Sequence, residues 1–157
     1  MAKRNLEGEA LKPFVKIAEP YGKKDGYDVT KGQGANNRIP LYSTDKPYFQ
    51  FGDLKVKHNN HCIIVEVESS GGLTNLVKYW HILHHHPEIK SIILMHIYHQ
   101  NSSNDYESHL ELWKFMWSQM KKTSLGNKIK ASCHAYRNSK ELESIADKFK
   151  EHLENMS

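Results

Sequence analysis

Apolar residues recur at intervals of three and four in four segments of the chain, which is the period of a helix with one buried face. The first segment, residues 5–18, carries Leu6, Ala10, Leu11, Phe14, Val15 and Ala18. Similar patterns run from Leu73 to the histidines before Pro87 and over residues 106–122. A last pattern follows Asn138 and Glu141, which resemble a capping box. Its inward positions are Leu142, Ile145, Ala146, Phe149 and Leu153.

Five short extended runs, rich in apolar residues, predict strands at 38–42, 48–56, 62–68, 91–99 and 128–136. Turn residues separate the first three runs, so we expect these to form a meander. Cys62 to Val65 is continuously apolar, which is typical of a central strand covered on both faces. The predicted order is αβββαβαβα. Strands that alternate with helices favour parallel crossovers, so we expect a three-layer α/β/α fold around a central mixed sheet.

The chain of 157 residues has the length of one domain, which would span residues 1–157. Residues 22–37 are rich in Gly, Asn and charge and predict a mobile basic loop rather than a second domain. Neither an 18-residue apolar run nor a signal-peptide stretch is found, so we expect a cytoplasmic protein without membrane contact. Cys62 and Cys133 lie in apolar strands, where a reduced thiol acts as a small, inert hydrophobe.

The formal net charge is +4, and its excess lies in the first part of the chain. Residues 1–60 hold 11 Lys and Arg against 7 Asp and Glu, whereas the rest hold 11 of each. Such an excess suits a phosphate backbone, although many equally basic domains bind no nucleic acid. Each basic residue here is equally typical of a solubilising surface charge. The candidates for phosphate contacts are Lys23, Lys24, Lys31, Arg38, Lys55 and Lys57.

Three carboxylates form the most specific pattern, namely Asp53, Glu66 and Glu68. Alternation along a strand sends Glu66 and Glu68 to one face and Val67 into the core. If the neighbouring strands pair through the turn near Asn59, Asp53 lies opposite or diagonal to the pair. Close carboxylates raise one another's pKa values unless a hard cation neutralises them, and oxygen ligands favour Mg²⁺, Mn²⁺ or Ca²⁺ over Zn²⁺. The alternative, a solvated strand end beside a turn, fits the apolar approach and the following helix less well.

Gly52-Asp53 and the run Ile63-Ile64-Val65-Glu66-Val67-Glu68 resemble the motif of the PD-(D/E)XK, or restriction-endonuclease-like, nucleases. That motif runs (P/G)-D, a spacer, apolar residues and (D/E)-x-K. The family core is a helix, a three-strand meander, a helix and a further strand, and this order covers most of residues 5–99. Glu68 departs from the pattern, because the family usually has Lys there. Some restriction enzymes carry Glu and remain active, whereas degenerate relatives also lack the Lys.

The resemblance implies that this chain hydrolyses nucleic-acid phosphodiester bonds, with DNA as the expected substrate, by a water activated on Mg²⁺ or Mn²⁺. Asp53, Glu66 and the Val67 carbonyl would hold the ion. Glu68 would accept a proton from the attacking water or bind a second ion. Glu9, or less readily Glu7, on the first helix could add an outer acidic group; an exposed helical Glu is an equally good interpretation.

The helix after the acidic strand adds a candidate cation. Asn75-Leu76-Val77-Lys78-Tyr79 approximates the Gln-x-x-x-Tyr that the family often carries there. Lys78 could replace the missing strand Lys and stabilise a pentavalent phosphate. The alternative is a lysine on a solvated face.

Histidines and aromatic residues suggest competing functions. His81 and His85 are four apart, His84 to His86 are consecutive, and His96 and His99 lie on or after a strand, but no Cys-x-x-Cys or His-Glu-x-x-His is present. A polar helix end is therefore favoured over a zinc site. A stacking platform or homodimer surface competes with core packing for the aromatic helix, which carries Trp113, Phe115, Met116 and Trp117.

Two other functions therefore stay open beside the nuclease. The first is a catalytically degenerate nuclease-fold domain that binds nucleic acid or serves in assembly, with Glu68 as the mark of lost turnover. The second is a histidine-based metal sensor, which would bind Zn²⁺ rather than Mg²⁺.

Overall fold

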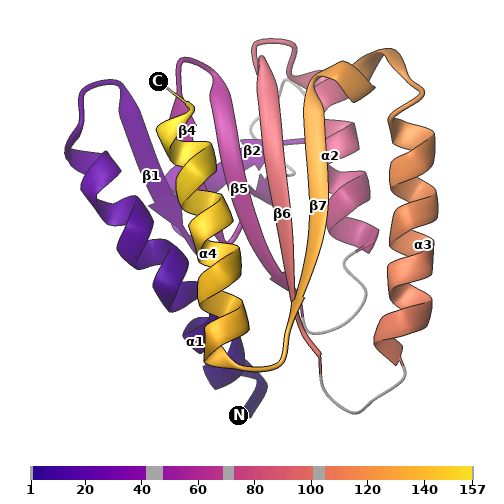
Figure 1. Cartoon of the computed structure of the whole chain (residues 1–157). Helices are drawn as coiled ribbons and strands as arrows, with labels where there is room; N and C mark the ends of the chain where they lie inside the picture. The colour runs from indigo at the N-terminus through magenta and orange to yellow at the C-terminus, as the bar shows by residue number, and fades with distance from the viewer. Residues whose placement is uncertain (1, 42–47, 69–72, 101–104, 157) are drawn as a thin grey trace.

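A computed structural model describes residues 2–41, 48–68, 73–100 and 105–156 of the chain (Figure 1). Its α-helices are α1 (Ala2–Ala18), α2 (Leu73–His85), α3 (Asp105–Met120) and α4 (Ser139–Glu154). Short 3₁₀ helices are η1 (Glu19–Lys23), η2 (Ala35–Asn37) and η3 (Ser124–Asn127). The strands are β1 (Tyr27–Lys31), β2 (Arg38–Pro40), β3 (Tyr48–Gln50), β4 (Leu54–His58), β5 (His61–Glu68), β6 (Ser91–His99) and β7 (Ile129–Tyr136).

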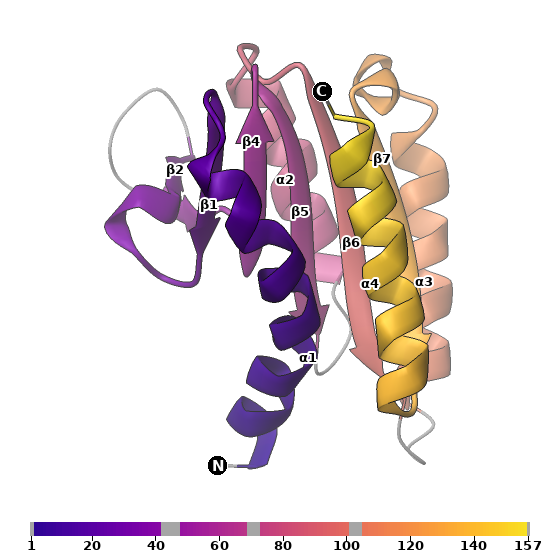
Figure 2. The same cartoon turned by 60° about the vertical axis from the view of Figure 1, so that its left-hand side comes forward.

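A mixed sheet in the order β1-β4-β5-β6-β7 forms the centre of the described structure. The pairs β1–β4 and β4–β5 are antiparallel, whereas β5–β6 and β6–β7 are parallel. Within the described ranges, strands β2 and β3 pair with each other and not with the main sheet, and Figure 2 shows β2 apart from that sheet. The predicted α/β class with a mixed sheet is therefore confirmed.

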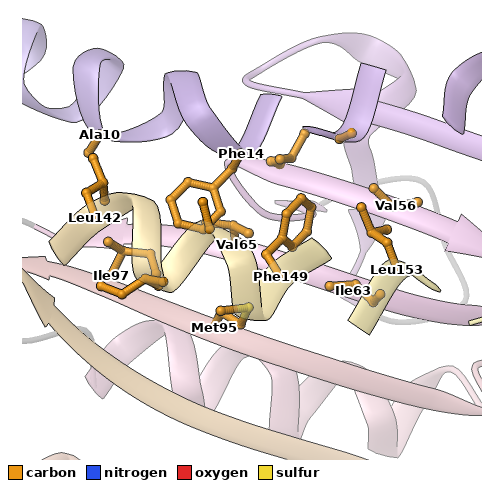
Figure 3. Packing of buried hydrophobic residues seen from close by; sticks show 14 of the residues in the cluster. Ala10, Phe14, Val56, Ile63, Val65, Met95, Ile97, Leu142, Phe149 and Leu153 are labelled. Atoms are coloured by element: carbon orange, nitrogen blue, oxygen red, sulfur yellow. The ribbon is translucent and has the colours of Figure 1, made fainter. Parts of the chain in front are cut away.

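Helices cover both faces of this sheet. On one face, α1 and α4 meet over the central strands, with the rings of Phe14 and Phe149 edge to face at 5.6 Å (Figures 1 and 3). On the other face, residues of α2 and α3 such as Tyr79 and Trp113 pack on the strands. Side chains alternate along β5, so Val65 faces the first layer and Ile64 the second. Whether a residue of β5 has an odd or an even number therefore determines which helix layer its side chain faces.

The predicted meander is only partly right. The run 48–56 is broken at Gly52, which has φ of +91°, so it forms β3 and β4 rather than one strand. The run 38–42 contributes β2, which pairs with β3 and not with the main sheet. The meander that does form is β1–β4–β5. In the sequence, the β2–β3 hairpin lies between β1 and β4, which are neighbours in the sheet.

The prediction of a loop over residues 22–37 is wrong for Tyr27–Lys31, which form the edge strand β1. Within this strand Thr30 is buried and the remaining side chains are half-buried or exposed. An edge strand with so little burial lacks the apolar alternation that identifies a strand in a sequence. Thr30 is fixed by a residue outside the strand, because its hydroxyl donates to the Asn37 side-chain oxygen at 2.9 Å.

The second half of the chain follows the prediction closely. The Asn138 side chain accepts the Glu141 backbone N–H at 2.9 Å and caps α4, whose five predicted inward residues are buried. Both cysteines are free thiols, and Cys62 is buried. On α3, Trp113 is a core residue, but Phe115 is 63% exposed, so core packing explains only part of that aromatic cluster. Among the described helices none is long and apolar enough to cross a membrane.

Candidate active site

Asp53 lies directly before β4 and is fixed against β5 by its backbone and its side chain. Its N–H donates to the Val65 carbonyl at 3.1 Å. One carboxylate oxygen accepts the Val67 N–H at 2.8 Å, and the other accepts the Gln50 side-chain amide at 3.1 Å. Because Leu54 pairs with Val65, Asp53 falls opposite Glu66, as the sequence predicts.

Gly52 makes this position of Asp53 possible. Its φ of +91° is a conformation that other residues rarely adopt. A Cβ there would lie 2.6 Å from Cγ2 of Ile64 and 3.4 Å from the Tyr79 hydroxyl. The glycine thus lets the chain turn from the hairpin into β4 at a point where its backbone lies close to Ile64 of β5 and Tyr79 of α2.

Glu66 is 3% exposed and faces α2, where a lysine and a tyrosine meet it. Its Oε1 accepts hydrogen bonds from Lys78 Nζ at 2.9 Å and from the Tyr79 hydroxyl at 2.5 Å. The Lys78 ammonium also donates to the Gln50 carbonyl at 3.1 Å. Lys78 therefore bridges the acidic strand and the hairpin strand β3.

Glu68 lies two residues further along the same face, and its Oε1 accepts a hydrogen bond from Asn75 Nδ2. The same amide lies 3.5 Å from Oε2 of Glu66. Asn75, Lys78 and Tyr79 occupy positions i, i+3 and i+4 of α2, which share one face of a helix. That face presents two donors and a cation to the two glutamates.

His96 lies on β6 beside Glu66 in the parallel register and is fully buried. Its Nδ1 is 3.6 Å from Oε1 of Glu68, and neither ring nitrogen has a hydrogen-bond partner among the described residues. Burial lowers the pKa of His96, which keeps the ring neutral at pH 7. A neutral imidazole adds no positive charge to that of the Lys78 ammonium.

The electrostatics of the cluster are those of carboxylates with too few cations. Burial raises the pKa of Glu66 to about 7, against the opposing effect of the Lys78 ammonium. Burial also raises the pKa of Asp53, and the Glu68 charge adds to this, although the Val67 N–H opposes it. Among the described residues, three carboxylates face one ammonium here, so full ionisation would leave a net charge of −2, which a divalent cation would neutralise.

The donor set fits a hard divalent ion that is only partly bound by protein. Within the described residues no group of three or more His, Cys, Asp or Glu side chains is arranged to hold a metal ion. Mg²⁺ needs fewer protein ligands, because it is usually held by one or two carboxylates together with waters and substrate phosphates. Asp53, directly before β4, and Glu66 on the adjacent strand β5 meet that requirement, and an ion would compete with the present hydrogen bonds for their oxygens.

Some predicted site residues lie elsewhere. Glu9 is exposed, pairs with Lys12 at 2.8 Å, and belongs to the helix on the other face of the sheet from Glu66. The structure therefore does not bring Glu9 to the carboxylates. The Glu7 side chain lies outside the described part of the chain.

The predicted basic residues divide into three groups. Lys31 ends β1 opposite Leu54, beside Asp53, and Arg38 pairs with Gln50 across the hairpin, so both lie near the site. Toward the other end of the β1–β4 pair lie Lys23, Lys24 and Lys57. Lys55 is only 7% exposed, with its ammonium 4.4 Å from the centre of the Phe51 ring, so the expectation of a surface phosphate contact is wrong there.

The site also contains residues that the sequence did not assign to it. Asn75 and Tyr79 were visible only as an approximate family pattern, and the catalytic assignment omitted them. His96 carried a weak signal, as a polar residue inside an apolar strand. Gln50 carried none, because its contact with Asp53 depends on the hairpin that folds back beside β4.

A hollow of about 520 Å³ lies near the end of the parallel strands that is far from the carboxylates. It is lined by residues at the starts of β5, β6 and β7 and at the end of α4, including His61, Ser91, Lys130 and His152. The carboxylates are at the other end of β5, so this hollow is not part of the candidate site.

Comparison of the chain with protein-family models, with curated proteins and with solved structures finds no match.

Proposed function

We propose that this protein is a metal-dependent nuclease of the restriction-endonuclease-like class, which hydrolyses phosphodiester bonds of nucleic acid, with DNA as the expected substrate. The observation that carries the proposal is the position of Lys78. Its ammonium lies 2.9 Å from Glu66, in a buried cluster that also contains Asp53. The motif of this nuclease class places a lysine beside these two acids, two residues after the second acid. This chain has Glu68 at that strand position, and the ammonium comes from Lys78 of α2 instead.

The arrangement of elements gives the proposal further support. Apart from the 3₁₀ helices and the β2–β3 hairpin between β1 and β4, the chain runs through a helix, the antiparallel strands β1, β4 and β5, a second helix and the parallel strand β6. This is the core order of that nuclease class. The acids lie where the central strand leaves the sheet.

Each residue has a role in such a reaction. Asp53 and Glu66 would hold Mg²⁺ or Mn²⁺, with the Val67 carbonyl as a further oxygen ligand. When bound, the ion would polarise the phosphate and lower the pKa of its water. Lys78 would neutralise charge that develops on the phosphoryl oxygens, and Glu68 would accept the proton of the attacking water. Tyr79 and Asn75 donate to the glutamates and fix their orientation.

The competing proposal is a nuclease-fold domain without turnover that binds nucleic acid or serves in assembly. Such a domain has no need for a buried acidic cluster that costs stability. The raised pKa of Glu66 marks this cost, so the cluster favours the enzyme. The two proposals differ in their requirement for a divalent ion.

Cleavage of supercoiled and linear DNA in Mg²⁺ or Mn²⁺ tests the proposal. Wild type is compared with Asp53→Asn and Glu66→Gln, which keep the shape of each side chain and remove its charge. Glu143→Gln on the exposed face of α4 is the matched control. We expect nicking that EDTA abolishes, that both site variants lose and that the control keeps. DNA binding without cleavage, insensitive to metal and to both site variants, would favour the binding domain instead.

A further inference from the structure

The β2–β3 hairpin carries a hollow of about 280 Å³, lined by Gln33, Asn37, Arg38, Tyr48 and Gln50. The hairpin has two unlike faces. Ile39 and Phe49 pack into the core on the α2 side, whereas Arg38, Tyr48 and Gln50 alternate with them and line the hollow. The position of β2 outside the main sheet is visible in Figure 2.

The lining of the hollow combines one cation, one aromatic ring and three carboxamides. The Arg38 guanidinium lies 4.3 Å from the centre of the Tyr48 ring, and the other lining side chains are carboxamides. Tyr48 is 41% exposed, although it is large and aromatic. Among the described residues that line the hollow there is no carboxylate, and Arg38 is the only cation.

The hollow is directly connected to the candidate active site. The side chain of Gln50, which lines the hollow, donates to the Asp53 carboxylate at 3.1 Å, and its backbone carbonyl accepts from Lys78 at 3.1 Å. Asn37, also in the lining, donates to the Gly52 carbonyl at 2.9 Å. A ligand in the hollow would therefore lie beside the acids, separated from them by one layer of side chain.

These groups match the parts of a nucleotide. An exposed aromatic ring stacks on a base of any identity, an arginine pairs with phosphate and stacks on planar rings, and carboxamides bond to base edges. The volume lies near the lower end of ligand pockets, which hold about 300 to 1,000 Å³, so it suits one nucleotide rather than a duplex.

We propose that this hollow binds one unpaired nucleotide of the substrate, with its base on Tyr48 and its phosphate on Arg38, next to the bond that is cut. The proposal rests on the proposed nuclease function and specifies its substrate class. A base inside a duplex is stacked on its neighbours and cannot reach Tyr48 without being unpaired, which costs a few kcal/mol. The preferred substrate is therefore a single strand, or a duplex with an unpaired nucleotide at the cleavage position.

Binding in EDTA separates this proposal from catalysis, because no hydrolysis occurs. The probe is an oligonucleotide that contains 2-aminopurine, titrated as a single strand and as a fully paired duplex. The fluorescence of this base reports stacking. Variants are Tyr48→Ala, Tyr48→Phe and Arg38→Gln, with Phe115→Ala as the control, since Phe115 is an exposed aromatic residue on α3.

We expect wild type to bind the single strand more tightly than the duplex and to change its fluorescence on binding. Tyr48→Ala should weaken single-strand binding on the order of tenfold or more and remove the fluorescence change at saturation. Tyr48→Phe should keep that change, and Arg38→Gln should weaken binding and its salt dependence while the change at saturation persists.

Two results would overturn the proposal: equal affinity of wild type for single strand and duplex, or equal effects of Tyr48→Ala and Phe115→Ala. Failure of the nuclease proposal is distinguishable, since it appears as absent cleavage in Mg²⁺ while the binding pattern in EDTA persists.

Discussion

Lys78 reaches the acidic cluster from a helix, and a single amide-for-ammonium change tests what it does there. We expect Lys78→Gln to lower the cleavage rate about 10²- to 10³-fold, as loss of one transition-state donor does. Single-turnover cleavage measures this, with Lys114→Gln on α3 as an exposed control. A Lys78→Gln variant that cleaves as fast as wild type would contradict the assigned role.

Glu66 links the charge of the site to the stability of the fold. Burial raises its pKa from 4.5 to about 7, so the folded protein holds a proton that the unfolded chain releases. The contribution of Glu66 to the free energy of unfolding of the metal-free protein should then fall as pH rises from 5 toward 8, by up to about 3 kcal/mol. Urea unfolding at the two pH values in EDTA measures the fall.

Glu66→Gln cannot titrate and is the reference for that experiment. It should show a smaller fall between pH 5 and 8 than wild type. Other groups with shifted pKa, such as His134 with a pKa lowered by burial to about 4, are present in both proteins and cancel in the comparison. If the free energy of unfolding fell equally in the two proteins, ionisation of Glu66 would not destabilise the fold, contrary to this prediction.

At the scale of elements, the turn at Gly52 joins the hairpin to β4 and sets the place of Asp53. Gly52→Ala should destabilise the protein by about 2 kcal/mol more than Gly32→Ala, and should also slow cleavage. Both glycines have positive φ, but a Cβ at Gly32 meets open space, whereas one at Gly52 meets Ile64 at 2.6 Å. Thermal or urea unfolding of both variants gives the comparison. Similar losses would mean that backbone strain alone, and not the close approach to β5, determines the cost.

Elements with a strong local pattern could be predicted from the sequence, and elements held by distant contacts could not. The strand over 91–99 and the capped helix α4 have periodic apolar residues and a cap within the segment itself. β1 is held by pairing with β4 and by the distant Asn37, so its own residues carry little signal.

The same distinction applies to the site. Asp53, Glu66 and Glu68 were predictable because strand alternation and one turn place them. The contacts of Lys78 and Gln50 depend on how α2 and the hairpin rotate against β5, which no local pattern states. Glu9 was expected near the acids, but its helix packs on the other face of the sheet.

At the scale of the whole molecule, α1 and α4 pack through one cluster of apolar side chains on strands of the sheet, which include antiparallel and parallel ones. Figure 3 shows Phe14 and Phe149 between the two helices, with Val65 and Met95 beneath. Phe149→Ala should cost about 3 to 5 kcal/mol of unfolding free energy. Phe115→Ala on the exposed face of α3 should cost under about 1 kcal/mol. Comparable losses in urea unfolding would contradict the described layering.

The central claim is that Asp53 and Glu66 together hold a divalent ion, and direct titration of Mn²⁺ tests it without knowledge of the substrate. Calorimetry on wild type, Asp53→Asn, Glu66→Gln and Glu143→Gln should show binding in wild type and in Glu143→Gln, and its loss in both site variants. Absence of binding in wild type, or binding unchanged by both site substitutions, would contradict the account and favour a domain that binds nucleic acid without metal chemistry.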